Sequence, residues 1–330
     1  MGVFVDKVLD RNAQGFRAVA VVAVAALLAA WLTVELFAYW RGVDRNEDRQ
    51  TKLQQATDLL NNQAMGSGMS GAVSLLGLSE PLLKDMARGV IAPDYPQALA
   101  RLSVARERFL VQGVYVMSAD GTVVAHETAG PRSTGINLAY RPYFQQAIQG
   151  GVSVYPAIGT NSQERGLYYA APLYEMDSPS GAIIGVVMFK VGFESFDSLL
   201  ARIGMPALLL SPQGVAFSFT RPEWLFAVAP PLTQARIDSI RASRQFGRHF
   251  DKGVASALPF SPEATQVVLN GVPHAIAHRN IDLHDPGGQW QLVLLDDVSA
   301  LMPWSQRLQV GAVAFVLFAL LGWLLLDLLR

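Results

Sequence analysis

The sequence predicts an α+β protein with two tandem units, each an antiparallel sheet flanked by helices, on a long helix between two membrane-spanning segments. Three observations lead to this prediction. Apolar residues concentrate at the two ends of a chain that is 51% hydrophobic and only 16% charged. Between the ends, the apolar period changes from that of helices to that of strands. The strand pattern then occurs a second time, which indicates duplication of one unit.

The composition excludes several classes of protein. The chain has 330 residues and no cysteine, which excludes disulfides, thiolate catalysis, iron–sulfur clusters and cysteine-ligated zinc. Its formal net charge is −1, from 26 basic and 27 acidic residues, so no basic surface predicts a nucleic-acid partner. Because no Walker, HExxH or G-x-S-x-G motif occurs, we expect no cofactor and no catalysis by this chain.

Both apolar ends predict transmembrane helices. Residues 18–40 carry one charge, Glu35, and residues 310–326 carry none. A helix needs about 20 apolar residues to cross a bilayer core, so the second span is extended to 308–330. The first apolar run is longer than that of a signal peptide, which favours an uncleaved anchor.

We expect the leader, residues 1–17, to be cytoplasmic and the region between the two helices to be exported. Basic residues flank the first span in nearly balanced numbers, but long domains escape the charge rule. The chain then returns to the cytoplasmic face at Arg330.

Residues 41–110 predict stalk helices. Apolar residues recur at helical period, with an interruption near 66–71, a resumption over 75–83 and a second helix over 97–110. The interruption, GSGMSG, matches G-x-G-x-x-G, but that fingerprint requires a preceding strand. We therefore interpret its glycines as a bend in the stalk.

The first predicted unit covers residues 111–203. It opens with a hairpin on the Asp120-Gly121 turn, which is a strong hairpin signal. A short helix over 141–149, three strands and a helix over 194–203 follow.

The second predicted unit covers residues 204–307 and repeats this order. A hairpin is followed by a helix over 234–243, a second hairpin on Asn270-Gly271 and a closing strand. The pattern of each unit is close to a PAS-like fold.

Three histidines raise the question of a metal site. The group would comprise His274, His278, His284, Asp282 and Asp285. On the predicted strand, His274 and His278 would lie about 13 Å apart on one face, which is too far for one ion. We expect solvated strand and loop histidines and no metal.

The candidate ligand site combines three short segments. Its residues are Tyr140, Arg141 and Tyr143 at a loop-to-helix junction, Thr160 and Ser162 in the next loop, and Lys190 at the end of an apolar strand. Arginine with Tyr, Thr and Ser hydroxyls is a donor set that captures a small carboxylate, which Arg can bind bidentately. Each cation also has an ordinary interpretation, Arg141 as a surface ion pair and Lys190 as an edge-strand charge.

These segments resemble the double-Cache (tandem PAS-like) periplasmic sensor domains, most closely those of C4-dicarboxylate sensor histidine kinases of the DctB type. The resemblance covers residues 41–304 and is carried by Y-R-P-Y-F (140–144), G-T-x-S-x-x-R-G (159–166) and F-K-V (189–191). It implies two tandem PAS-like (Cache) units on the stalk helix. It also implies that the membrane-distal unit binds a small, C4-dicarboxylate-like organic acid.

The resemblance also implies residue roles. Arg141, Tyr143, Thr160 and Lys190 would hold the acid, with Tyr140 and Ser162 nearby. It further implies a homodimer in a bacterial inner membrane, with the central domain periplasmic and a cytoplasmic kinase or other output partner. No phosphoacceptor or ATP-binding motif follows the second helix in this sequence, so we expect the output from a further region or a partner.

Two alternatives remain. The chain could be a structural or regulatory membrane subunit that uses a Cache-like domain as an interaction surface within a larger complex. An enzyme acting on the bound acid is the more distant alternative, because no general base stands beside the donors.

Overall fold

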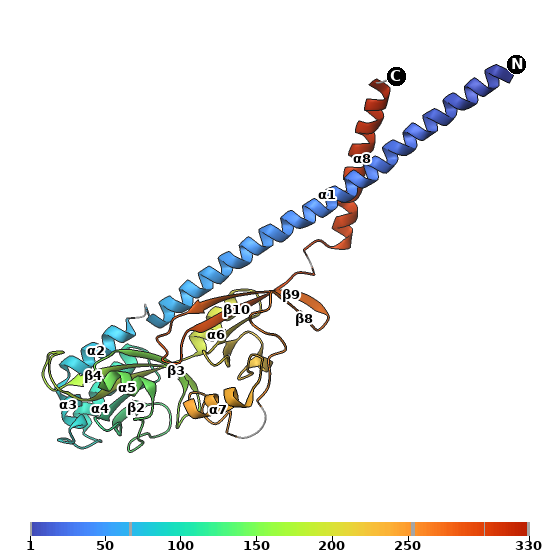
Figure 1. Ribbon diagram of the computed structural model, residues 1–330. Coiled ribbons are helices and arrows are strands. Elements are labelled where there is room, and N and C mark those ends of the chain that lie inside the picture. Colours follow the sequence, from blue (N-terminus) through green and yellow to red (C-terminus); the bar gives the residue numbers. More distant parts are fainter. Residues whose placement is uncertain (1, 66–67, 252–254, 300, 329–330) are drawn as a thin grey trace. The chain divides into compact units, whose positions relative to one another are not determined.

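The computed structural model describes residues 2–65, 68–251, 255–299 and 301–328, with side chains from residue 17 onward. The chain separates into two compact units. The first consists of Met1–Gln50, Val268–His274 and Asp297–Arg330, and the second of Thr51–Val267 and Ala275–Asp296. Figure 1 shows the order of the elements.

The first compact unit holds two apolar helices, α1 (Gly2–Met65) in its N-terminal part and α8 (Trp304–Leu328). Both are long and apolar enough to cross a membrane. The Arg41 guanidinium donates a hydrogen bond of 2.6 Å to the Gln306 amide oxygen. In the chain, the two apolar helices precede and follow the elements of the two sheets, as predicted.

The stalk helices follow the predicted interruption. Helix α1 ends at Met65, and it is followed by α2 (Met69–Ser79), α3 (Pro81–Ala87) and α4 (Pro96–Arg108). Gly66 of the GSGMSG motif lies outside the described residues. A helix, and not a strand, precedes the motif, so the context that a nucleotide-binding fingerprint requires is missing.

The first sheet has the strand order β2-β1-β5-β4-β3. Its strands are β1 (Gly113–Ser118), β2 (Val123–Thr128), β3 (Ser153–Ile158), β4 (Arg165–Tyr174) and β5 (Ile183–Gly192). The neighbouring strands pair antiparallel. Helix α5 (Pro142–Ile148) stands between β2 and β3 in the chain, and α6 (Glu194–Arg202) follows β5.

Strand alternation gives this sheet two different faces. Val114, Val187 and Phe189 belong to a core shared with α2, α3 and α4. Tyr115 and Met188 point to the opposite face, where α5 packs on β3, β4 and β5. The candidate ligand residues belong to this second face, which we call the α5 face.

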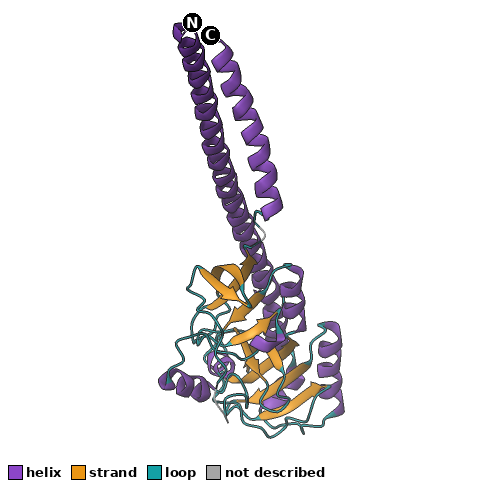
Figure 2. Ribbon diagram, turned by 90° about the vertical axis from the view of Figure 1, so that its right-hand side faces the viewer, coloured by secondary structure: helices purple, strands orange, loops and turns teal. Residues whose placement is uncertain are grey.

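The second sheet repeats the topology, with the order β7-β6-β10-β9-β8. Its elements are β6 (Ala207–Leu210), β7 (Ala216–Phe219), the 3₁₀ turn η1 (Pro222–Trp224), α7 (Gln234–Ser243), β8 (Gln266–Leu269), β9 (Val272–Ile281) and β10 (Trp290–Asp297). Figure 2 shows the strands of both sheets among their helices. The tandem α+β fold is therefore confirmed, whereas the domain boundaries stay a prediction.

Candidate functional site

A cavity of about 240 Å³ opens on the α5 face of the first sheet. Arg141, Tyr143, Thr160, Ser162 and Lys190 all line it. Tyr140 does not line the cavity, but its hydroxyl lies 3.0 Å from Thr160 Oγ1. The structure thus brings together three segments that are separated in the sequence.

Arg141 is the most buried cation of the site. It is the N-cap residue of α5 and only 2% exposed. Its Nη2 donates to Ile158 O and to Thr160 Oγ1, both at 2.8 Å. Its Nη1 donates to Arg244 O at 3.0 Å, whereas Nε–H has no partner among the described residues.

This arrangement corrects two expectations. The sequence predicts either an arginine that binds a carboxylate bidentately or a surface ion pair. Instead, both Nη2 hydrogens are engaged by the protein, because the side chain also holds the β3–β4 turn. Nε–H and one Nη1–H remain for a ligand.

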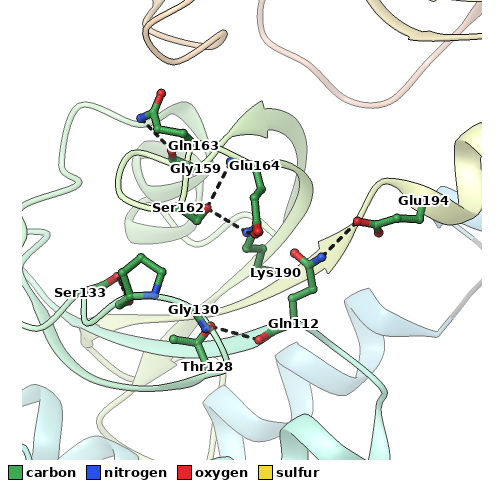
Figure 3. Close-up of polar contacts among 11 residues, drawn as sticks. Gln112, Thr128, Gly130, Ser133, Gly159, Ser162, Gln163, Glu164, Lys190 and Glu194 are labelled. Carbon is green, nitrogen blue, oxygen red and sulfur yellow. Dashed lines mark hydrogen bonds and ion pairs between the residues drawn. The ribbon is translucent and has the colours of Figure 1, made fainter. Parts of the chain in front are cut away.

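Lys190 reaches the cavity from β5. It shares its face with Val186 and Met188, as strand alternation predicts, and its side chain is 5% exposed. Its Nζ donates to Ser162 Oγ at 3.0 Å and to Glu164 Oε2 at 2.9 Å. Figure 3 shows both acceptors reaching it from the β3–β4 turn.

Stacked tyrosines form one wall. The Tyr143 and Tyr168 rings are 5.2 Å apart at 11°, and burial raises the pKa of both phenols. They are therefore neutral hydroxyls at physiological pH. The buried Tyr168 hydroxyl has no hydrogen-bond partner among the described residues, so it is available to a ligand.

The loop after β2 covers another side of the cavity, which residues 128–131 and 133 line. His126 holds this loop: its Nε2 accepts from Ser133 N at 3.2 Å, and its Nδ1 lies 3.0 Å from Thr134 Oγ1. Because Nε2 is an acceptor, the ring is neutral here. Burial lowers the pKa of His126.

Sequence reasoning missed two groups at the cavity. Glu164 lies inside the G-T-x-S-x-x-R-G segment, so its position in that segment was the signal that could have identified it. Arg106 and Gln112 come from the end of α4 and the start of β1. Arg106 pairs with Glu127 at 3.7 Å, and no sequence pattern relates these residues to the loops.

Contacts with the second sheet lie directly behind the site. Gln245 O accepts from Ile158 N at 2.8 Å, and Gln245 Nε2 donates to Pro156 O at 2.8 Å and to Asp285 Oδ2 at 2.9 Å. Burial raises the pKa of Asp285. Strand β3 is therefore tied to the loop that follows α7.

Two of the histidines considered as metal ligands have backbone carbonyls as partners. Nδ1 of His274 lies 2.9 Å from Val272 O, and Nδ1 of His278 lies 3.0 Å from Pro262 O. His274 is only 6% exposed, so it is a buried strand residue and not a solvated one. No group of three metal-ligating side chains occurs in the described part of the chain.

Comparison with known proteins places this site in context. No family model matches the chain. The C4-dicarboxylate transport sensor protein DctB of Pseudomonas aeruginosa is 30% identical over 166 residues, which cover 50% of this chain and 25% of that protein. The chain thus spans about a quarter of the length of the curated relatives it matches.

Solved structures show the same fold. The sensor domain of the V. cholerae histidine kinase DctB matches with a TM-score of 0.61 at 19% identity, over 76% of this chain and 96% of that domain. The ligand-binding domain of the Pseudomonas fluorescens chemoreceptor CtaA, solved with L-alanine, matches with a TM-score of 0.50 at 14% identity, over 78% and 98%. The resemblance is therefore confirmed: half of the chain is similar in sequence to DctB proteins, and its fold is that of the DctB sensor domain.

Proposed function

We propose that this chain is the extracytoplasmic input module of a bacterial membrane sensor and that its first sheet unit binds a small organic acid. One observation carries the proposal. Two cations, Arg141 and Lys190, are 2% and 4% exposed and line the same cavity. Burying cations is costly unless counter-charges meet them. Glu164 meets Lys190, and an anionic ligand would supply the counter-charge for Arg141.

The free donors suggest how the acid binds. Arg141 Nε–H and the Tyr168 hydroxyl have no partner among the described residues, so one carboxylate would accept from them. A second carboxylate would approach Lys190. A volume of about 240 Å³ corresponds to several waters at ~30 Å³ each, which suits a few-carbon acid.

Occupancy would be transmitted by a shift between two arrangements of a homodimer. A ligand shifts such an equilibrium only if it binds one arrangement better. The Arg141 contact with Arg244 O links the site to the second sheet unit. We place the module in the inner membrane, with the central domain in the periplasm and a cytoplasmic kinase or other output partner.

The test is calorimetric titration of the full chain in lipid nanodiscs with succinate, butyrate and L-alanine. We expect saturable binding of succinate, accompanied by slower amide exchange in residues 129–136 and 159–166. Preference for L-alanine would keep the sensor function but change the ligand class. Absence of binding by all three at millimolar concentration would contradict the proposal and favour the structural-subunit alternative.

A further inference from the structure

Glu164 places a carboxylate of the protein itself at one end of the ligand cavity. Its Oε2 accepts from Lys190 Nζ at 2.9 Å. The side chains differ sharply in burial, since that of Glu164 is 63% exposed and that of Lys190 is 5% exposed. The Glu164 carboxylate therefore faces solvent, whereas the Lys190 ammonium is enclosed by the protein.

The backbone of Glu164 is held independently of its side chain. Its carbonyl accepts from Gly159 N at 2.9 Å, and the turn is closed again by Gln163 N donating to Gly159 O at 3.0 Å. The next residue, Arg165, is anchored to Asp197 by contacts of 3.0 and 2.6 Å. The Glu164 side chain can therefore rotate away from Lys190 without moving the turn.

Lys190 has a limited number of donors. An ammonium group has three, and Ser162 and Glu164 take two of them. A ligand carboxylate arriving at Lys190 would also meet the like charge of Glu164. One donor remains on Lys190, but because of this repulsion a diacid binds there best with Glu164 displaced, whereas a monoacid held at Arg141 leaves Glu164 in place.

From this geometry we infer that Glu164 is an internal competitor that occupies the Lys190 end of the cavity and is displaced by the second carboxylate of a diacid. The inference rests on the proposed function, because it concerns the same cavity. Glu164 would raise the diacid concentration at which the sensor responds and reduce its preference for diacids over monoacids.

The test compares Glu164→Gln with wild type, using full-length protein in nanodiscs and calorimetry with succinate and butyrate. Glutamine keeps the size but not the charge. We expect Glu164→Gln to bind succinate about 3- to 30-fold more tightly than wild type. The substitution breaks the ion pair with Lys190 and removes the repulsion between Glu164 and the ligand carboxylate. The gain for butyrate should be smaller. Glu175→Gln is the matched control, because Glu175 is 53% exposed and pairs with Arg88 at 3.1 Å outside the cavity. It should change neither affinity.

A double-mutant cycle with Lys190→Ala isolates the competition. In that background, Glu164→Gln should strengthen succinate binding much less than it does in the wild-type background. An equal gain in both backgrounds would overturn the inference, because the effect would then be general charge relief. An unchanged or weaker succinate affinity in Glu164→Gln would also overturn it.

The two proposals fail differently. If wild type binds acids and Arg141→Ala does not, but Glu164→Gln has no effect, only the role of Glu164 is wrong. If neither wild type nor Glu164→Gln binds any acid, the proposed function fails together with the inference.

Discussion

The two sheet units have the same strand order but differ at the positions that hold the cations. In the first unit, Lys190 follows Phe189, which pairs with Val114. In the second unit, the matching pair is Ala207 with Leu294, so the position of Lys190 is taken by Leu295, which is fully buried. The difference shows that topology supplies the sheet, while single side chains supply the site.

The helix that follows the first hairpin differs in the same way. Arg141 is the N-cap residue of α5 and makes no side-chain capping bond. The N-cap residue of α7 is Thr233, whose hydroxyl accepts from Arg236 N and so stabilises the helix end. The N-cap side chain of α5 therefore lines the cavity, whereas the N-cap side chain of α7 stabilises its own helix.

Each sheet unit nevertheless has an arginine beside its cavity that donates to two backbone carbonyls. Arg236 lines a hollow of about 350 Å³ in the second unit and donates to Gln213 O and Ala229 O at 2.9 and 3.0 Å. Arg141 does the same for Ile158 O and Arg244 O. We therefore expect substitution of either arginine to lower the free energy of unfolding, and substitution of Arg141 alone to weaken acid binding.

The largest expected effect is that of Arg141→Ala. Loss of a charge-assisted contact predicts roughly 10- to 150-fold weaker succinate binding. Two carbonyls also lose their donor, so the free energy of unfolding should fall by about 1–3 kcal/mol. Arg236→Ala should lower stability by a similar amount and leave binding intact. Calorimetry and thermal unfolding of both variants check this, and equal succinate affinity in wild type and Arg141→Ala would place the pocket elsewhere.

The second prediction exchanges a residue between the units. Lys190→Leu introduces the side chain that the second sheet carries at the same place. We expect succinate affinity about 10-fold lower, a smaller loss for butyrate, and little change in melting temperature, because the half-exposed Glu164 regains water. Equal losses for the two acids, measured by calorimetry, would show that Lys190 does not contact a second carboxylate.

The sequence predicted the fold more completely than the site. Period-two alternation with Asp120-Gly121 and Asn270-Gly271 predicted both pairs of hairpin strands, since local pattern and turn chemistry agree there. Alternation also predicted the face of Lys190. The contact of Arg141 with Arg244 could not be predicted, because residues far apart in the chain meet only through packing.

Glu164 illustrates the same limit at short range. The sequence shows that Glu164 lies between Ser162 and Arg165. It does not show which way the side chain points. That depends on the backbone of the β3–β4 turn, in which Gln163 has a φ of 55°, a value that local pattern seldom predicts. The pairing with Lys190 therefore became visible only in three dimensions.

A third prediction concerns the space around Lys190. A Cβ atom at Gly166 would lie 3.1 Å from Lys190 Cε and 3.3 Å from its Cγ, so Gly166→Ala should shift the lysine stem by a few tenths of an ångström. We expect about threefold weaker succinate binding, with butyrate less affected. Stronger succinate binding in this variant would mean that the displaced stem reaches the ligand better than the native one.

The smallest expected effect compares one histidine from each unit. Burial lowers the pKa of both His126 and His249. Above pH ~6.5 both rings are neutral in the folded and unfolded chain. As the pH falls below that value, the unfolded chain takes up protons first, so stability decreases until the lower folded pKa values are reached.

Of the two histidines, only His126 accepts a hydrogen bond from a loop amide, the backbone N–H of Ser133. His249 stacks on Phe226. The charges around His126 oppose each other, because Glu127 raises its pKa and Arg132 lowers it. Tyr115 stacks on its ring. Protonation of Nε2 abolishes the acceptor, so between pH 7.5 and 5.5 the loop over residues 129–136 should exchange its amides severalfold faster after correction for the intrinsic pH effect. His126→Gln should reduce that pH dependence, whereas His249→Gln should preserve it. Hydrogen exchange read by mass spectrometry decides: if His126→Gln keeps the full pH response, the loop is held by other contacts and the two histidines are equivalent.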